Sequence, residues 1–296
     1  LGNGENMRLS ATFKVGNISV AALSDAAAEM PLPKFFNEVS DEEWTTALSI
    51  DTPNESVPFN FGSFLLRGSG RTVLLDTGFG EQGPYAAAQG AAGLLDRIRD
   101  LGVGLDEIDA VVHTHLHFDH VGWNTVADGD KRSPTFRNAV WRVSDEEINW
   151  WNAGAVQPHP DYEHILEDVF DPIVGQGKVE TFSGETLVEP FLTSIPTPGH
   201  TPGHTSFLLS SAGEHLLLVG DAAHHPEHLI HHDWVPAVDN DPSETTRSRR
   251  RIVNLAIEKD AMVTGGHFPI LTIGKLSEID DEISFLEVDI DETDQF

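Results

Sequence analysis

Short runs in which apolar and polar residues alternate recur along the chain, and this period of two predicts half-buried β-strands. Ala11–Val15 and Ile18–Leu23 are two such runs, joined by a Gly-Asn pair that is typical of a hairpin turn. Phe61–Leu66 and Arg71–Leu75 predict a second hairpin, which ends at Asp76. Further strands are predicted at Ile108–Val112, Thr135–Val143, Val179–Phe182, Phe191–Ile195, Thr205–Leu209, His215–Val219 and Ala261–Thr264.

Helical spacing occurs between these strands. In Ala91–Leu101 the apolar residues recur three and four positions apart, and Gly102 ends the pattern. Ser40–Glu43 and Ser144–Glu147 each place a glutamate three residues after a serine, which is the capping-box pattern that opens a helix. The other predicted helices are Tyr162–Phe170 and Thr245–Lys259.

The chain of 296 residues is long enough for one large domain with a sizeable core. We expect residues 1–11 to be an N-terminal extension, residues 12–276 to form the domain and residues 277–296 to be an acidic C-terminal segment. Nine acidic residues and no basic residue occur in that last segment, which predicts an edge strand or a partly mobile tail. Spacing alone therefore predicts a fold of mixed α and β content, without choosing its architecture.

Charge and composition narrow the classes of partner. The net charge is −30, from 48 acidic and 18 basic residues, so we expect repulsion of nucleic acids and of anionic membrane surfaces. No apolar run reaches the roughly 18 residues of a membrane span. The first residues lack the basic-then-apolar order of a signal peptide, and the compartment stays open between cytoplasmic and periplasmic or secreted. Because the chain has no cysteine, any metal ion must be held by nitrogen and oxygen.

The histidine-rich stretch His113–His120 leaves the predicted strand Ile108–Val112. Burying its imidazoles and its carboxylate without partners would cost several kcal/mol for each group. A divalent metal ion removes that cost, because neutral imidazole and carboxylate are its natural ligands. A solvated polar loop is the alternative. The spacing of the residues places them on a turn rather than on one face of a helix.

The motif His-x-His-x-Asp-His resembles the signature of the metallo-β-lactamase superfamily, and four more motifs follow the order of that family over residues 60–275. They are Asp76-Thr-Gly, Thr197-Pro-Gly-His200, Gly220-Asp221 and Gly265-Gly-His267-Phe-Pro. The resemblance implies an α+β fold, the four-layer αβ/βα sandwich of the metallo-β-lactamase family. It also implies that Asp76 fixes a loop rather than binding metal.

The resemblance further implies a site for two divalent metal ions. One ion would be held by His115, His117, His200 and Asp221, and the other by Asp119, His120, Asp221 and His267. Zinc is the expected metal, with manganese, iron or cobalt as alternatives. From the residues alone, His200 and His204 are equivalent candidates, and only the family pattern selects His200, leaving His204 and His113 beside the ligands.

The order Gly-Asp-Ala-Ala-His224, with later Asp-x-Asp-Pro and His-Phe-Pro pieces, is similar to the lactonase and methyl-parathion-hydrolase branch. This similarity implies a dinuclear metal-dependent hydrolase that uses a bridging hydroxide, most simply a lactonase or carboxylic esterase. Asp119 and His224 are the expected catalytic residues. His224 opens a second histidine-rich stretch, which ends at His232. Its other histidines are expected to be loop or surface residues: His225, His228, His231 and His232.

Three alternatives accompany this hypothesis. Hydrolysis of organophosphate triesters comes second, β-lactam hydrolysis third, and metal binding without turnover belongs to a different class. The expected partner is a small neutral ester or lactone, and a homodimer is compatible with the sequence. Phe35, Phe36 and Trp44 lie in an irregular stretch that reaches over the active site in the resembled family, although ordinary core aromatics would give the same pattern.

Overall fold

The computed structural model describes residues 9–31, 39–48, 56–81, 93–158, 160–269, 272–280, 282–290 and 296. Within these ranges the strands form two seven-stranded sheets and a small two-stranded sheet. In spatial order, the first sheet contains β1 (Ser10–Val15), β2 (Ile18–Pro31), β3 (Ser56–Gly68), β4 (Arg71–Leu75), β5 (Ala110–Val112), β8 (Val140–Ser144) and β9 (Val179–Phe182). The second contains β10 (Thr186–Glu189), β11 (Leu192–Pro196), β12 (Thr205–Ser211), β13 (Glu214–Leu218), β14 (Met262–Thr264), β15 (Gly274–Ile279) and β16 (Glu282–Glu287). The two-stranded sheet pairs β6 (Thr125–Asp128) with β7 (Lys131–Pro134).

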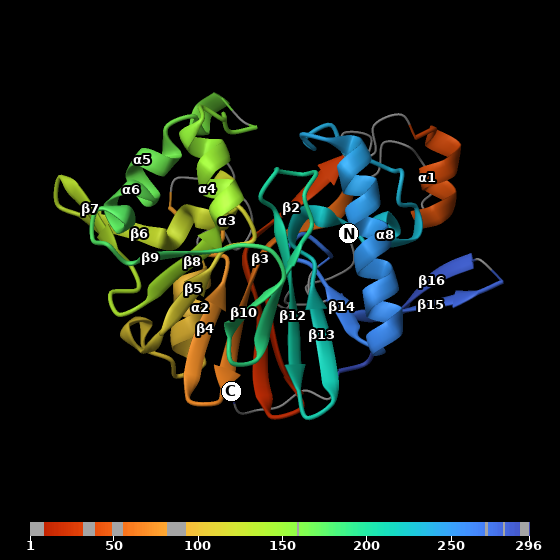
Figure 1. The fold of residues 1–296 in the computed structure, drawn as a ribbon, viewed down its shortest axis with the longest axis horizontal. Helices are drawn as coiled ribbons and strands as arrows, with labels where there is room; N and C mark the ends of the chain where they lie inside the picture. The colour runs from red at the N-terminus through yellow and green to blue at the C-terminus, as the bar shows by residue number, and fades with distance from the viewer. Residues whose placement is uncertain are drawn as a thin grey trace, which may run out of the picture.

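Helices lie outside the two large sheets (Figure 1). Those in the described ranges are α1 (Asp41–Leu48), α2 (Leu94–Asp100), α3 (Phe118–Val121), α4 (Asp145–Asn152), α5 (Ile165–Val169), α6 (Asp171–Val174), α7 (Glu227–Ile230) and α8 (Pro242–Lys259). None of these helices is long and apolar enough to cross a membrane.

The side chains of each strand point alternately to the two faces of its sheet, so one strand can contribute to two packed layers. In β13, Leu216 and Leu218 enter a core shared by both sheets, whereas Leu217 packs on the opposite face with Ile252 and Val253 of α8. Successive side chains of a strand point to opposite faces, so one apolar run can serve two cores. In the same way, β2 contributes to the shared core and to a second core against α2. The expected four-layer sandwich is confirmed.

The hairpins, the α2 and α8 helices and most strands agree with the sequence, but three predictions were wrong. Thr135–Val143 is not one strand, because residues 135–139 form turns and only Val140–Ser144 pairs with β5 and β9. Tyr162–Phe170 is a 3₁₀ turn followed by α5, and both short pieces pack their apolar residues into one core. The capping box at Ser144 is absent, because the Glu147 side chain turns inward instead.

The acidic end of the chain supplies an edge of the second sheet. β15 runs across residue 276, and β16 pairs antiparallel with it. Gly274 lies opposite Glu287 at one end of this pairing, and Ile279 lies opposite Glu282 at the other. Gly274 is required here, since a Cβ at that position would lie 2.3 Å from the Phe285 ring. The division of the chain at residues 11 and 276 stays a prediction.

The irregular stretch before β3 is described only in part. Trp44 of α1 is fully buried and packs against Trp234, as a core aromatic does. Phe35 and Phe36 lie outside the described residues, so the lid interpretation stays a prediction for them.

Candidate metal centre

Strand ends bring the chemistry-bearing residues to one edge of the sandwich. β4, β5 and β8 are parallel neighbours in the first sheet, and β13 and β14 are parallel neighbours in the second. The segment His113–His120 follows β5, Asp221 lies in a 3₁₀ turn after β13, and His267 follows β14. His200 comes from the loop between β11 and β12. All seven expected ligands therefore meet, although they come from both halves of the chain.

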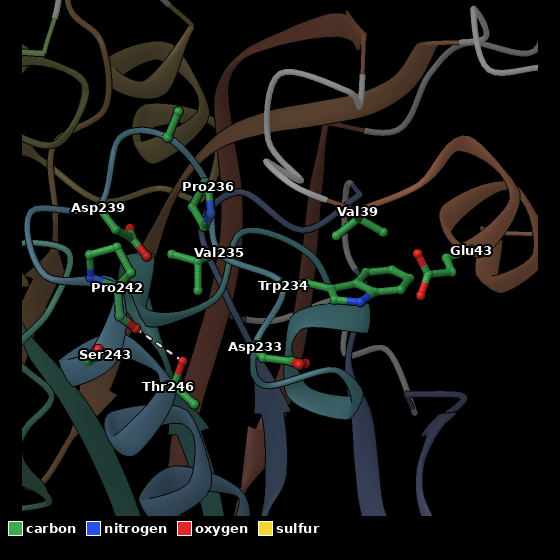
Figure 2. Close-up of a pocket in the computed structure, with 11 residues that line it drawn as sticks. Val39, Glu43, Asp233, Trp234, Val235, Pro236, Asp239, Pro242, Ser243 and Thr246 are labelled. Carbon is green, nitrogen blue, oxygen red and sulfur yellow. Dashed lines mark hydrogen bonds between the residues drawn. The ribbon is translucent and has the colours of Figure 1, made fainter.

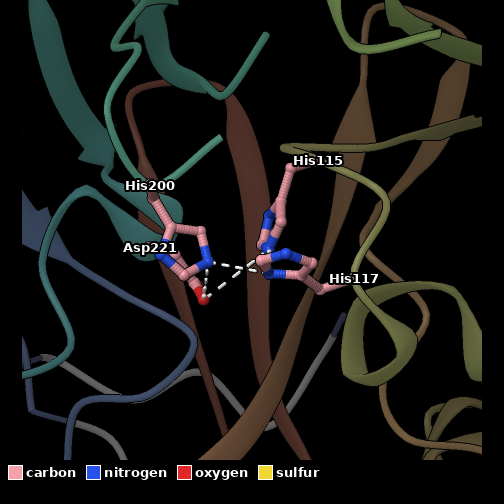
Figure 3. A group of neighbouring side chains, drawn as sticks. All are labelled: His115, His117, His200 and Asp221. Atoms are coloured by element: carbon pink, nitrogen blue, oxygen red, sulfur yellow. Dashed lines mark hydrogen bonds and ion pairs between the residues drawn. The ribbon is translucent and has the colours of Figure 1, made fainter. Parts of the chain in front are cut away.

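The first group consists of His115, His117, His200 and Asp221 (Figure 3). His117 Nδ1 lies 2.9 Å from both His115 Nε2 and His200 Nε2. Asp221 Oδ2 lies 3.3 Å from His200 Nε2 and 3.7 Å from His115 Nε2. All four residues are buried, so the converging nitrogens and the Asp221 oxygen face one another rather than water.

The second group consists of Asp119, His120 and His267. The Nε2 atoms of His120 and His267 lie 3.3 Å apart, and Asp119 Oδ2 lies 3.5 Å from His267 Nε2. Asp221 reaches this group as well, with Oδ1 3.2 Å from His120 Nε2 and Oδ2 3.2 Å from His267 Nε2. Asp221 therefore stands between the two groups.

In three of the histidine rings, the nitrogen that faces away from the cluster is hydrogen-bonded, and this bond sets the orientation of the nitrogen that faces into it. The Nδ1 atoms of His120, His200 and His267 lie 2.7–2.9 Å from Asp76 Oδ2, Asp239 Oδ1 and Asn60 O respectively. Carboxylates and carbonyls only accept hydrogen bonds, so each Nδ1 carries a proton, and each ring in its neutral form turns a lone pair inward from Nε2. Lone pairs that converge without a donor between them repel one another. A cation between them removes the repulsion, and the residues fit a bound metal.

Electrostatics in the cluster favour positive charge at its centre. Burial lowers the pKa of His115 and of His117 well below the ordinary value, which keeps these rings neutral as ligands must be. Burial opposes charge on His120 too, but Asp221, Asp119 and Asp76 raise the pKa of His120 well above its usual range. For Asp221, burial is outweighed by His120 and His267, which hold the pKa of this carboxyl well below its usual range. The same carboxylates that attract a proton would attract a metal cation.

His204 and His113 lie beside the cluster and belong to neither of these two groups. Both ring nitrogens of His204 are occupied by protein: Nε2 accepts from the Asp221 backbone N–H at 2.9 Å, and Nδ1 contacts Thr197. Gly220 allows this contact, because its φ is +56° and a Cβ there would lie 2.7 Å from His204 Nε2. His113 is fully buried, with Nδ1 3.5 Å from Asp76 Oδ1.

His224 is the one member of the second histidine stretch that reaches the cluster within the described residues. It forms a third group with Asp221 and His267. Its Nε2 lies 3.3 Å from Asp221 Oδ2, and its ring stacks on His267 at 5.3 Å between centroids and 9° between planes. His224 N donates to His228 Nδ1, which fixes the turn that presents this ring.

Two supporting carboxylates were missed by sequence reasoning. Asp239, buried, holds His200 and belongs to the Asp-x-Asp-Pro piece, so a signal for it was available. Glu147 is also buried and accepts from Leu116 N, the residue between two expected ligands. Its place in an apparent capping box concealed it. Arg249 of α8 was missed too; it donates to Ala222 O and so braces the turn that carries Asp221.

A cavity of about 530 Å³ adjoins the cluster at Asp239. Figure 2 shows Asp239 and Pro242 toward one end of it and Trp234 and Glu43 toward the other. Three acidic residues, Glu43, Asp233 and Asp239, are among those that line the cavity, and the Asp239 side chain is buried where it meets His200. Its walls therefore repel anions.

The family follows from comparison with known proteins. A family model of the metallo-β-lactamase superfamily matches residues 63–267, which include all seven expected ligands. This chain belongs to the metallo-β-lactamase superfamily. It is 30% identical over 192 residues to the N-acyl homoserine lactonase AttM of Agrobacterium fabrum, a match that covers 60% of this chain and 64% of that relative. It is 25% identical over 232 residues to an N-acyl homoserine lactonase of Bacillus cereus, covering 73% of this chain and 84% of that one.

Solved structures share the fold over nearly the whole length of the chain. The structure of AidC, described as a dizinc quorum-quenching lactonase in complex with a product, has a TM-score of 0.79 at 21% identity. A hydrolase named AbOPH has a TM-score of 0.80, also at 21% identity. Both matches cover 97% of this chain and 99% of the other chain. At this identity the likeness concerns the fold.

Proposed function

We propose that this chain is a metal-dependent hydrolase that binds two divalent ions and opens lactones. The observation that supports this most directly is the convergence of imidazole lone pairs on Asp221. Four of the surrounding rings face inward with Nε2, and the outer nitrogens of three of them are held by Asp76, Asp239 and Asn60 O. Such outer hydrogen bonds are typical of metal-bound histidine.

The proposed ligand sets share Asp221. His115, His117, His200 and Asp221 would hold one ion, and Asp119, His120, Asp221 and His267 the other. Imidazole nitrogen and carboxylate oxygen suit zinc, while manganese, iron and cobalt accept the same donors.

Two bound ions would supply a hydroxide nucleophile near neutral pH and a Lewis acid for the substrate carbonyl. The protein residues orient the reactants. Asp119 has the most exposed side chain of the ligand set, 12% against 4% or less for the others, so its carboxylate is placed to orient an entering water. His224 presents a buried ring beside Asp221 and can donate one N–H to an oxygen of the substrate.

The substrate class is inferred from similarity and charge together. Relatives at 24–30% identity are named N-acyl homoserine lactonases. A neutral lactone also avoids the repulsion that a net charge of −30 and an acid-lined cavity impose on anions. Hydrolysis adds water across the ring C(=O)–O bond and yields a hydroxy acid. The anionic product would be repelled by the same field, which favours its release.

A substrate panel tests the proposal. An acyl-homoserine lactone, an aryl ester, a neutral phosphotriester, nitrocefin and a phosphodiester are compared by kcat/KM, before and after chelation and zinc replacement. We expect the lactone or aryl ester to react fastest, the triester next, the β-lactam third and the phosphodiester negligibly. A triester hydrolysed faster than every lactone would assign the chain to phosphotriester chemistry, and chelator-insensitive turnover would exclude the metal mechanism.

A further inference from the structure

Glu147, near the start of α4, is a fully buried carboxylate whose partners all donate to it. Its Oε1 accepts from Leu116 N at 3.0 Å and from Trp151 Nε1 at 2.9 Å. Its Oε2 accepts from Thr201 Oγ1 at 2.6 Å. Three donors and both oxygens in use hold this carboxylate in a fixed position. Burial raises the pKa of Glu147, and the three hydrogen bonds act against that rise.

The two main-chain segments that Glu147 joins carry histidines of one metal group. Leu116 lies between His115 and His117, in the loop that follows β5 of the first sheet. Thr201 directly follows His200, in the loop between β11 and β12 of the second sheet. One carboxylate therefore spans the two halves of the chain at the point where three imidazoles meet.

Packing leaves this part of the structure little room to shift. A Cβ at Gly203 would lie 2.1 Å from Glu147 N, so the second loop rests directly against the first turn of α4. Trp151, which donates to Glu147, also places its ring edge-on to His117 at 6.0 Å and 82°. The helix start, both loops and one ligand ring are thus in mutual contact.

An ordinary helix-capping role does not account for Glu147. Ser144 makes no side-chain cap bond, and both oxygens of Glu147 are used by groups outside the first turn of α4. Burying a carboxylate costs several kcal/mol unless its bonds compensate, and an apolar residue of similar size would be cheaper for stability alone. Its position is explained by the need to fix the two loops relative to each other.

The second metal group is held differently. Asp76 bonds the outer nitrogen of His120, and Asn60 O bonds that of His267. Among the interactions of the described residues, those of Glu147 reach neither ring. Loss of Glu147 should therefore affect the two ions unequally.

We propose that Glu147 is a positioning residue for one ion of the pair, the ion held by His115, His117 and His200. This inference rests on the proposed two-ion site. Glu147 acts by setting the distance between the Leu116 and Thr201 loops, not by touching substrate or metal. A backbone bond from Thr205 N to Thr114 O, 3.0 Å long, also joins these segments, so the halves stay together when Glu147 is changed.

Zinc titration of the full-length protein tests the proposal. Metal-free protein is titrated against a chromophoric chelator, and His117→Ala and His267→Ala identify which binding step belongs to which group. Glu147→Ala should weaken the first ion by about 10–100-fold, the range typical of groups that hold ligands in place, and leave the second unchanged. Glu147→Gln keeps the shape and one acceptor oxygen, so it should restore most of that affinity.

Two further variants keep the test decisive if Glu147→Ala fails to fold. Thr201→Val removes only the hydroxyl that donates to Oε2 and should weaken the same ion by a smaller factor. Glu146→Gln, an exposed neighbour on α4, removes the same charge and should change neither step. Equal weakening of both ions, or no change in the first, would overturn the assignment of Glu147. Wild-type protein that binds no zinc would instead overturn the proposed function itself.

Discussion

Two stretches of this chain are rich in histidine, and they have different surroundings. In His113–His120, three rings turn inward and meet residues from the other half of the chain. In the stretch from His224 to His232, only His224 does so, while the rest bond within their own segment. His225 Nδ1 accepts from Glu227 N, and His231 stacks on Trp234 at 4.0 Å.

The difference lies in what precedes each stretch and what holds the outer ring nitrogens. The first stretch leaves the end of a buried parallel strand and receives Asp76 from the neighbouring strand end. The second is a short helix, α7, with its flanking turns in the second half of the chain. His228 of α7 is fully buried, so the expectation that it is a loop or surface residue was wrong. Histidine density alone therefore does not identify a metal site. The feature that supports one is the convergence of strand ends, with a carboxylate or carbonyl behind three of the rings.

The largest effect is expected for Asp221→Ala. Because Asp221 contacts both metal groups, its loss should release one ion and weaken the other, with kcat/KM falling by about 10³-fold or more, as several kcal/mol of lost stabilisation implies. Elemental analysis and kinetics measure this. Asp233→Ala, an exposed acid beside the second stretch, is the matched control and should keep both ions. Full metal content in Asp221→Ala would contradict the shared-ligand geometry.

A smaller effect is expected for His204→Ala. His204 braces the Asp221 backbone through Nε2, so its loss should reduce kcat/KM by about 10–100-fold while metal remains bound. The comparison with His200→Ala is decisive, because that variant should lose metal. If the two variants exchange these behaviours, the ligand in this loop is His204.

Asp239→Asn should have a milder effect, since asparagine keeps an acceptor for His200 Nδ1 but removes the charge. We expect the affinity of one ion to fall by about tenfold, the lower end of the range for such groups. Chelator competition measures it. Asp241→Asn, at the N-terminal cap of α8, is the control and should change the melting temperature more than metal affinity.

The smallest effect is expected for His231→Ala in the second stretch. Its side chain is 40% exposed and stacks on Trp234, so stability should change by about 0.5 kcal/mol or less, as for most surface substitutions. Metal content and kcat/KM should stay at the wild-type level. A marked loss of metal would show that the second stretch takes part in binding and would remove the contrast between the two.

The pattern of apolar and polar residues predicted much of the sandwich, because successive side chains of a strand point to opposite faces of its sheet. Leu216, Leu217 and Leu218 illustrate the limit, since an uninterrupted apolar run shows burial on both faces but not which face meets α8. The strand at Thr186–Glu189 was missed, because its exposed Leu187 and its buried Glu189 hide the period of two, whereas the edge strand Glu282–Glu287 lies in the segment for which an edge strand or tail was predicted. At Ser144–Glu147 a local capping pattern was present, and tertiary bonds to Leu116 and Thr201 overrode it.

The sequence by itself determined the family, the donor chemistry of the site and the strand ends from which the candidate ligands leave. A motif with fixed spacing carries these properties locally, and the absence of cysteine limits the donors to nitrogen and oxygen. Only the tertiary structure decided which groups stand behind the rings. Asp239 lies 39 residues from His200, and Asn60 lies 207 residues from His267, so no local pattern links them. Packing of the two sheets sets these distances, and with them the direction of each lone pair.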